Sequence, residues 1–158
     1  MTKRKLIIIS IFILLTLPIL YVGRWMVQGL NEIDQKFEFM PTVVNLSDLK
    51  NEKTRNYEFL SCMYSDSYYP EVLVDKCRTI LIELCFRIEN YKPENLNELY
   101  ELTHGSTIEL NRMEAVFNYH DSEIETVARE CFAENFAFIA NTYGCDADIE
   151  ELIAPRTW

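Results

Sequence analysis

The stretch "PEVLVDKCRTILIELCFRIENY", residues 70–91, decides the fold, because it carries the strongest helical pattern in the chain. Its apolar side chains recur at spacings of three and four residues, which is the period of one face of an α-helix. Pro70 suits the first turn of such a helix, and Ile80 and Ile82 widen the apolar face. We therefore predict a helix at the centre of the fold, with a buried face made of Val74, Cys77, Leu81, Leu84, Cys85 and Ile88.

Helical patterns also occur before and after this stretch. No run of residues alternates convincingly with the period of two that is typical of a half-buried β-strand. The chain is long enough to bury a real core in one domain of ordinary size. We predict an all-α bundle of about five or six helices. Its further helical segments are expected at residues 45–69, 92–102, 106–120, 121–144 and 146–153.

The boundaries of these helices follow from residues that start or stop a helix. We expect His104 and Gly105 to separate two helices, because glycine is a common helix stop. Ser106 and Ser122 are predicted N-caps, since each has a glutamate three residues later, which is the spacing of a capping box. Gly144 is the predicted end of the last long helix.

The first part of the chain has the composition of a membrane anchor. Lys3, Arg4 and Lys5 precede an apolar stretch that extends over residues 6–27. A spanning helix needs roughly 20 mostly apolar residues, and Arg24 can extend its charge to the membrane interface. The alternative is a signal peptide that is cleaved after export, although the usual small-residue cleavage pattern is missing.

The positive cluster sets the orientation that we expect for this anchor. Basic residues favour the cytoplasmic side, so the N-terminus is predicted to be cytoplasmic and the rest of the chain to be exported. In a bacterium, this describes a single-pass protein of the inner membrane with a periplasmic domain. We divide the chain into an anchor at residues 1–29, a stalk or linker at 30–46, and an exported all-α domain at 47–158.

The exported part is strongly acidic. All 25 acidic residues lie at or after Glu32, whereas four of the 15 basic residues belong to the anchor. With 11 basic and 25 acidic residues, the exported part carries a formal charge of −14. This charge argues against binding to nucleic acid, whose phosphates require a basic face. It favours a basic protein partner or, alternatively, solubility alone.

Five cysteines lie in the exported part, where an oxidising compartment favours disulfide bonds. Cys77 and Cys85 share the central helix and lie roughly 12 Å apart along its axis, too far for a bridge. Cys62 and Cys77 are the predicted pair, because they lie at equal distances from the turn expected at residues 69–70. The alternative is that both are buried thiols of the core. A second bridge would have to join two of the three remaining cysteines.

The chain lacks the patterns that enzymes and metal sites require. It has no nucleophile elbow, no glycine-rich phosphate loop and no zinc-protease motif. Its two histidines, His104 and His120, lack the spacing of metal ligands. His120 and Asp121 fit a helix end followed by a helix start better than a catalytic pair. We therefore expect no enzymatic activity, no cofactor and no bound metal.

Candidate binding residues lie at helix junctions, where loops carry function on a rigid scaffold. In the turn "SDSYYPE", Asp66, Tyr68, Tyr69 and Glu71 are predicted to contact a partner. Tyrosines in a turn suit an interface, because they bury a large area at modest entropic cost. One of the two tyrosines could instead fold back onto the core. His104, at a second junction, is a further candidate, with a plain helix stop as the alternative.

Two cysteine-containing segments carry a resemblance to a known family. They are "FLSC", which ends at Cys62, and "RECFAENFAFI", which contains Cys131. Over roughly residues 55–153, the chain resembles the immunity proteins of type VI secretion amidase effectors in cysteine placement, helix order and acidic balance. The resemblance implies a periplasmic inhibitor that binds a toxic peptidoglycan-degrading enzyme and occludes its active site.

Export, acidity and the missing catalytic motifs favour the same function. We predict a membrane-anchored periplasmic immunity protein that binds and neutralises a basic toxic effector. The alternative is a structural tether that assembles a complex of the cell envelope. An inhibitor should protect cells from an enzyme encoded by a neighbouring gene, whereas a tether should depend on its own spanning helix.

Overall fold

The structure is a computed structural model that describes residues 44–158. The predicted anchor, residues 1–29, lies outside the described residues. Among residues 44–158, no helix is long and apolar enough to cross a membrane. All regular elements of this part are helices and it has no β-strand, which confirms the predicted all-α bundle. Its elements are η1 (Leu46–Asp48), α2 (Glu52–Arg55), α3 (Ser61–Tyr64), α4 (Glu71–Tyr91), α5 (Leu96–Tyr119), α6 (Thr126–Thr142) and α7 (Ile149–Leu152).

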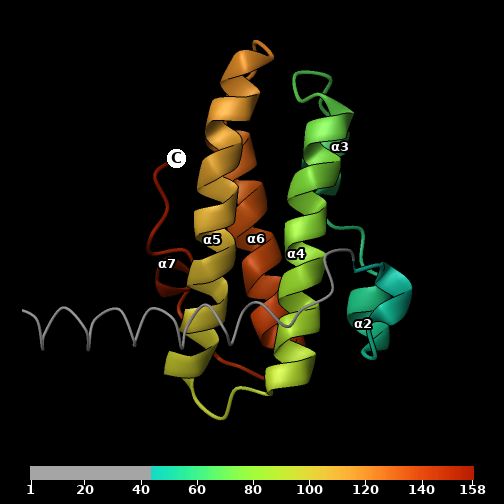
Figure 1. Ribbon diagram of the computed structural model, residues 1–158, viewed down its shortest axis with the longest axis vertical. Helices are drawn as coiled ribbons and strands as arrows, with labels where there is room; N and C mark the ends of the chain where they lie inside the picture. Colours follow the sequence, from blue (N-terminus) through green and yellow to red (C-terminus); the bar gives the residue numbers. More distant parts are fainter. Residues whose placement is uncertain (1–43) are drawn as a thin grey trace, which may run out of the picture. The chain divides into compact units, whose positions relative to one another are not determined.

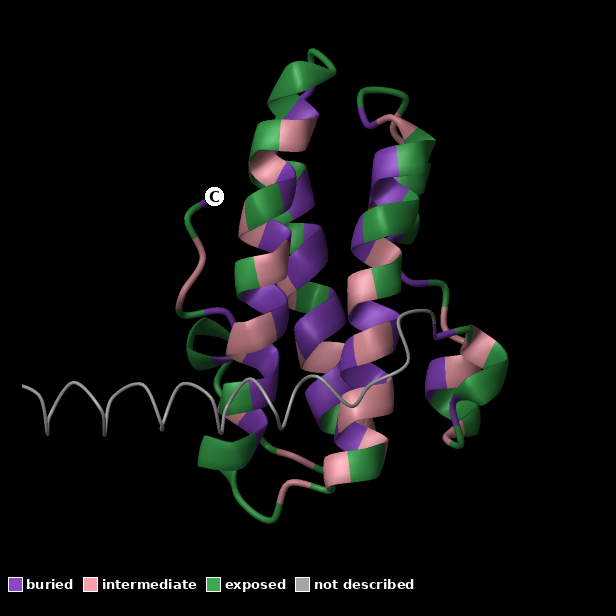
Figure 2. Cartoon of the chain, viewed as in Figure 1, coloured by how far each residue is buried: buried purple, intermediate pink, exposed green. Residues whose placement is uncertain are grey.

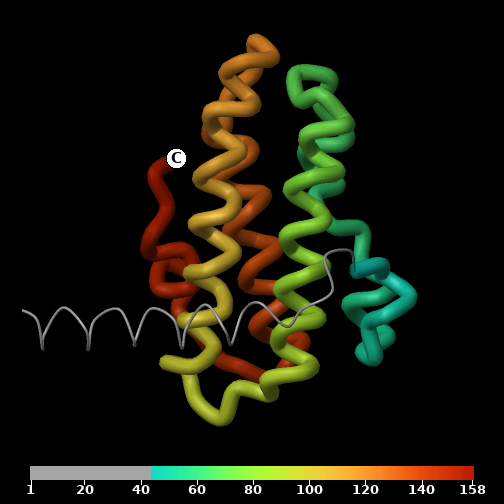
Figure 3. The backbone as a smooth tube through the Cα atoms, in the orientation of Figure 1, coloured from blue at the N-terminus to red at the C-terminus, as the bar shows by residue number. Residues whose placement is uncertain are grey.

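Three long helices, α4, α5 and α6, make up most of the bundle (Figure 1). The chain runs along them in alternating directions, turning at one end between α4 and α5 and at the other between α5 and α6 (Figure 3). Helix α3 packs against α6 and α4, and α7 packs against α5 and α6. The buried residues gather on the inward faces of these helices, so the core runs between them (Figure 2).

Helix α4 confirms the prediction made from its apolar spacing. All six side chains of the predicted face are at most 3% exposed. Pro70 is the N-cap residue, and its carbonyl accepts the backbone N–H of Leu73 at 2.8 Å. Lys92 ends the helix in the left-handed conformation and donates its N–H to the carbonyl of Ile88. Because α4 packs against α3, α5 and α6, its central position is confirmed as well.

Helix α5 contradicts the predicted break at His104 and Gly105. It continues without interruption through both residues, and Ser106 is buried inside the helix instead of capping one. Glycine inside a helix costs about 1 kcal/mol relative to alanine, whereas burying one leucine contributes about 1.5–3 kcal/mol. Leu102 and Leu110, on either side of the glycine, are both buried on the same core. Continuous packing therefore outweighs the local preference for a stop.

Helix α6 begins later than predicted. Its N-cap residue is Glu125, whereas Ser122 lies in the preceding loop, where its side chain is buried. The backbone N–H of Ser122 donates to the carbonyl of Phe117, which closes the loop onto the end of α5. Gly144, with a φ of 81°, follows the end of α6 as predicted. Such a positive φ favours glycine, because it has no Cβ atom.

The segment before α4 forms separate short turns instead of one helix over residues 45–69. Its apolar residues, Tyr57, Phe59, Leu60 and Met63, all pack at the core, although the chain turns between α2 and α3. Leu60 takes the left-handed conformation, with a φ of 59°, at the start of α3.

Candidate functional site

A disulfide bond joins Cys62 of α3 to Cys131 of α6, with 6.2 Å between their Cα atoms. The predicted pairing of Cys62 with Cys77 is therefore wrong. Cys77 is a free thiol that is fully buried in the core, and burial raises its pKa to about 12. The prediction assumed a long helix before the turn, but α3 is a single turn that packs against α6 and carries Cys62 toward that helix.

The start of α3 is also held to α6 by a buried side-chain amide. The backbone N–H of Leu60 donates to Oδ1 of Asn135 at 3.2 Å. The Nδ2 atom of Asn135 donates in turn to the carbonyl of Cys131 at 2.7 Å. Asn135 is 2% exposed, so the loss of either bond would leave a buried polar group without a partner. The disulfide and this amide together fix the base of the turn that follows α3.

The turn after α3 separates the two predicted partner-binding tyrosines. Tyr69 is 3% exposed, and its ring packs edge-to-face against Phe117. It is a core residue and is not available to a partner. Tyr68 is 39% exposed and packs edge-to-face on Tyr69, with ring centroids 5.1 Å apart. Asp66 is half-buried and accepts the backbone N–H of Tyr68 at 2.9 Å, whereas Glu71 is exposed.

The α5–α6 loop meets this turn at the same end of the bundle (Figure 1). The hydroxyl of Tyr68 lies 3.5 Å from Oε1 of Glu125, to which it donates. Glu123 and Asp121 are exposed in the same loop, and Tyr119, at the end of α5, is 84% exposed. We call the exposed surface of residues 65–72 and 119–127 the acidic tip.

Charge is distributed unevenly between the tip and the rest of the domain. Residues 65–72 and 119–127, which form the tip, together contain five carboxylates and no lysine or arginine. The second of these segments was not among the predicted binding residues, because its loop residues have the pattern of a helix start. The absence of basic residues from both segments was visible in the sequence. Only the fold, however, brings the two segments to one end of the molecule.

His104 does not belong to the tip. It precedes Tyr119 by 15 residues on the same helix, about 22 Å along the axis. Its Nε2 atom lies 2.6 Å from the backbone carbonyl oxygen of Glu151 in α7, and its ring stacks on Tyr100. The structure therefore gives His104 a role in joining α5 to α7.

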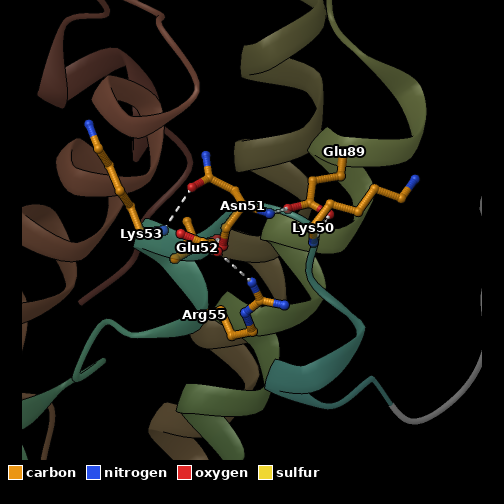
Figure 4. A network of polar contacts seen from close by, with 7 residues as sticks. Lys50, Asn51, Glu52, Lys53, Arg55 and Glu89 are labelled. Atoms are coloured by element: carbon orange, nitrogen blue, oxygen red, sulfur yellow. Dashed lines mark hydrogen bonds and ion pairs between the residues drawn. The ribbon is translucent and has the colours of Figure 1, made fainter.

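A second polar cluster lies around Glu89, near the opposite end of α4. Its carboxylate accepts the backbone N–H groups of Lys50 and Asn51 at 2.7 and 2.9 Å, and the hydroxyl of Tyr143 at 2.9 Å. Figure 4 shows Glu89 reaching these backbone groups, and the Asn51 side chain accepting the N–H of Lys53 at the start of α2. The cluster borders an open pocket of about 530 Å³.

The bonds of this cluster are structural. Glu89 accepts hydrogen bonds from three donors, and these bonds tie the segment before α2 to α4 and α6. Burial raises the pKa of Tyr143, and its bond to Glu89 raises that pKa further, which keeps the phenol neutral. Within residues 44–158, no three His, Cys, Asp or Glu side chains are arranged to hold a metal ion. The acidic tip is therefore the better candidate for a functional surface.

Comparison with known proteins assigns the chain to a family but does not identify an activity. No curated protein and no solved structure matches it significantly, so the resemblance to amidase immunity proteins stays a prediction. The pattern that defines the family DUF5713, described as a family of unknown function, matches residues 53–158. The matched part includes both cysteines of the disulfide and both segments of the tip. The chain thus belongs to the DUF5713 family.

Proposed function

We propose that this protein is a binding protein without catalytic activity, which neutralises a basic toxic effector through its acidic tip. The observation that carries the proposal is the combination of exposed aromatic rings and carboxylates at one end of a rigid bundle. Tyr68 and Tyr119 are exposed there, within two segments that together contain five carboxylates and no lysine or arginine.

The two kinds of side chain have different roles in binding. Carboxylates attract a basic protein over long distances and raise the rate of encounter. Exposed tyrosines then supply buried area in the complex, where aromatic residues often dominate the binding energy. Val72 and Val127, which are 60% and 45% exposed at the same end, add apolar area beside them.

The conformation of the tip is also fixed in the absence of a partner. Tyr69 anchors the turn in the core, and the bond between Cys62 and Cys131 anchors α3 just before it. A preorganised surface loses less conformational entropy on binding than a flexible loop does. This rigidity suits an inhibitor that has to hold its target tightly.

The disulfide supports an oxidising location for this activity. Such bonds persist in the periplasm and in other exported spaces, and are rare in the cytosol. This agrees with the predicted anchor at residues 6–27, with its N-terminus in the cytoplasm. We therefore place the proposed binding in the periplasm, on the inner membrane.

Coexpression with the product of the neighbouring gene, directed to the periplasm, tests the proposal. The full-length chain should restore growth, whereas the variant D121N/E123Q/E125Q should protect much less. At about 0.5 kcal/mol per surface charge pair, three lost charges weaken binding about tenfold. The matched control E94Q/E101Q/D146N removes three exposed charges at the other end of the bundle and should protect fully. Equal protection by the two triple variants would refute a role for the tip.

A further inference from the structure

We propose that the acidic tip recognises an arginine side chain of its partner, stacked on the ring of Tyr68 with its guanidinium group facing Glu123 and Glu125. The inference rests on the proposed function and narrows the partner to a protein that presents an exposed arginine. It concerns one subsite within the tip, and three features of the structure carry it.

The first feature is the fixed position of the Tyr68 ring. Its backbone N–H is held by Asp66, its ring packs edge-to-face on the buried Tyr69, and its hydroxyl reaches Glu125. An exposed tyrosine with none of these contacts would have to be ordered by the partner, at a cost in side-chain entropy. Tyr68 is already ordered, yet 39% of its surface stays open.

The second feature is a pair of carboxylates beside that ring. Glu125 accepts the hydroxyl of Tyr68, and Glu123 is exposed two residues before it in the chain. Burial raises the pKa of the Tyr68 phenol and the charges of the two carboxylates raise it further, whereas the backbone of Glu123 lowers it. Within residues 44–158, neither glutamate forms an ion pair with a basic side chain. Arg129, the nearest arginine along the chain, donates its Nε–H to the carbonyl of Ile124. Both carboxylates are thus open to a cation from another molecule.

The third feature is that a flat aromatic ring and two carboxylates suit arginine better than lysine. A guanidinium group is planar, stacks on aromatic faces and forms paired hydrogen bonds with carboxylates. An ammonium group is more strongly hydrated and acts as a point charge. Stacking of a cation on an exposed ring contributes about 0.5–1 kcal/mol, a factor of about two to five in affinity. A subsite in which only the guanidinium group stacks therefore prefers arginine by up to that factor.

Tyr119 offers a matched control at the same end of the bundle. It is the more exposed ring, at 84%, but its ring contact is with His120, and no carboxylate binds its hydroxyl within residues 44–158. Substitution of either tyrosine by leucine removes an exposed ring and leaves the net charge unchanged. Only the substitution at Tyr68 should affect a subsite for arginine.

Calorimetric titration of the full-length chain with tetra-arginine and with tetra-lysine peptides tests this inference. The ratio of the two affinities is the readout, because attraction by the overall acidity affects both peptides alike. We expect tetra-arginine to bind about two- to fivefold more tightly to the wild type and to Y119L. The variant Y68L should bind both peptides equally. The variant E125Q, which alters only an exposed side chain, should also lose the preference.

The outcomes separate this inference from the proposed function. Equal affinities in the wild type, a preference that survives in Y68L or in E125Q, or a preference that is lost in Y119L would overturn the arginine subsite. Protection against the neighbouring effector could then still hold, since the growth experiment does not depend on the peptides. A preference that disappears in Y68L and E125Q but persists in Y119L would support the subsite, even if the neighbouring gene product were the wrong effector.

Discussion

The bond between Cys62 and Cys131 should contribute about 4 kcal/mol to the free energy of unfolding. It closes a loop with a sequence separation of 69 residues. In the chain-entropy model, such a loop removes about 15 cal/mol/K of entropy from the unfolded state, which is about 4.4 kcal/mol at room temperature. In the native state, α3 keeps its packing against α6 and α4 without the bond. The main effect should therefore be a less stable bundle with the same fold.

Urea unfolding with and without a dithiol reductant measures this contribution. For the wild type, reduction should lower the midpoint by about 2 M, if the denaturant slope is about 2 kcal/mol/M. The double variant C62A/C131A should be less stable than the oxidised wild type and should not respond to the reductant. The variant C77A should still respond, because Cys77 takes no part in the bond.

Two results would refute the reasoning about the bond. One is a wild-type midpoint that does not change on reduction. The other is a thiol count, in denaturant without reductant, that differs from the three free cysteines of the structure, Cys77, Cys85 and Cys145. A response to reductant that vanished in C77A would restore the pairing of Cys62 with Cys77.

Three further predictions test the fold and the proposed location. The variant G105A should raise the free energy of unfolding by about 0.5–1 kcal/mol, because an added Cβ atom meets nothing within 4 Å. The variant G144A should lower the free energy of unfolding, because the φ of Gly144 is 81°. Urea unfolding measures both effects, and a loss of stability in G105A would contradict a continuous α5. The variant E89A should accelerate hydrogen exchange at the amides of Lys50 and Asn51, which donate to that carboxylate; unchanged exchange would contradict the role assigned to Glu89. Replacement of residues 1–29 by a cleavable signal should leave protection against the effector intact, and loss of protection would favour the envelope tether.

The long helices were predictable to different degrees, for a physical reason. The apolar spacing of α4 is dense enough that local preference and burial favour the same structure. In α5, Gly105 and Ser106 have the local signature of a stop and a new start, whereas the flanking leucines favour one helix. Burial prevailed there, because the core contacts of α5 contribute more free energy than one glycine costs.

The candidate site was only partly predictable. The turn with Asp66, Tyr68 and Glu71 was identified from residue types alone, and these residues do lie at an exposed end of the bundle. The placement of Glu123 and Glu125 beside Tyr68 was not predictable, because it depends on how α6 packs against α3. The same packing decided which cysteine lies opposite Cys62.

The sequence by itself determined the all-α class, the central helix α4, the acidity of residues 30–158 and the end of α6 just before Gly144. These depend on the periodicity and composition of short segments, where neighbouring residues decide the outcome. Only the tertiary structure decided that α5 is continuous, that Tyr69 is buried while Tyr68 stays open, and that Cys62 bonds to Cys131. Each of these features depends on contacts between segments that are far apart in the chain. Such contacts form only when the helices pack against one another.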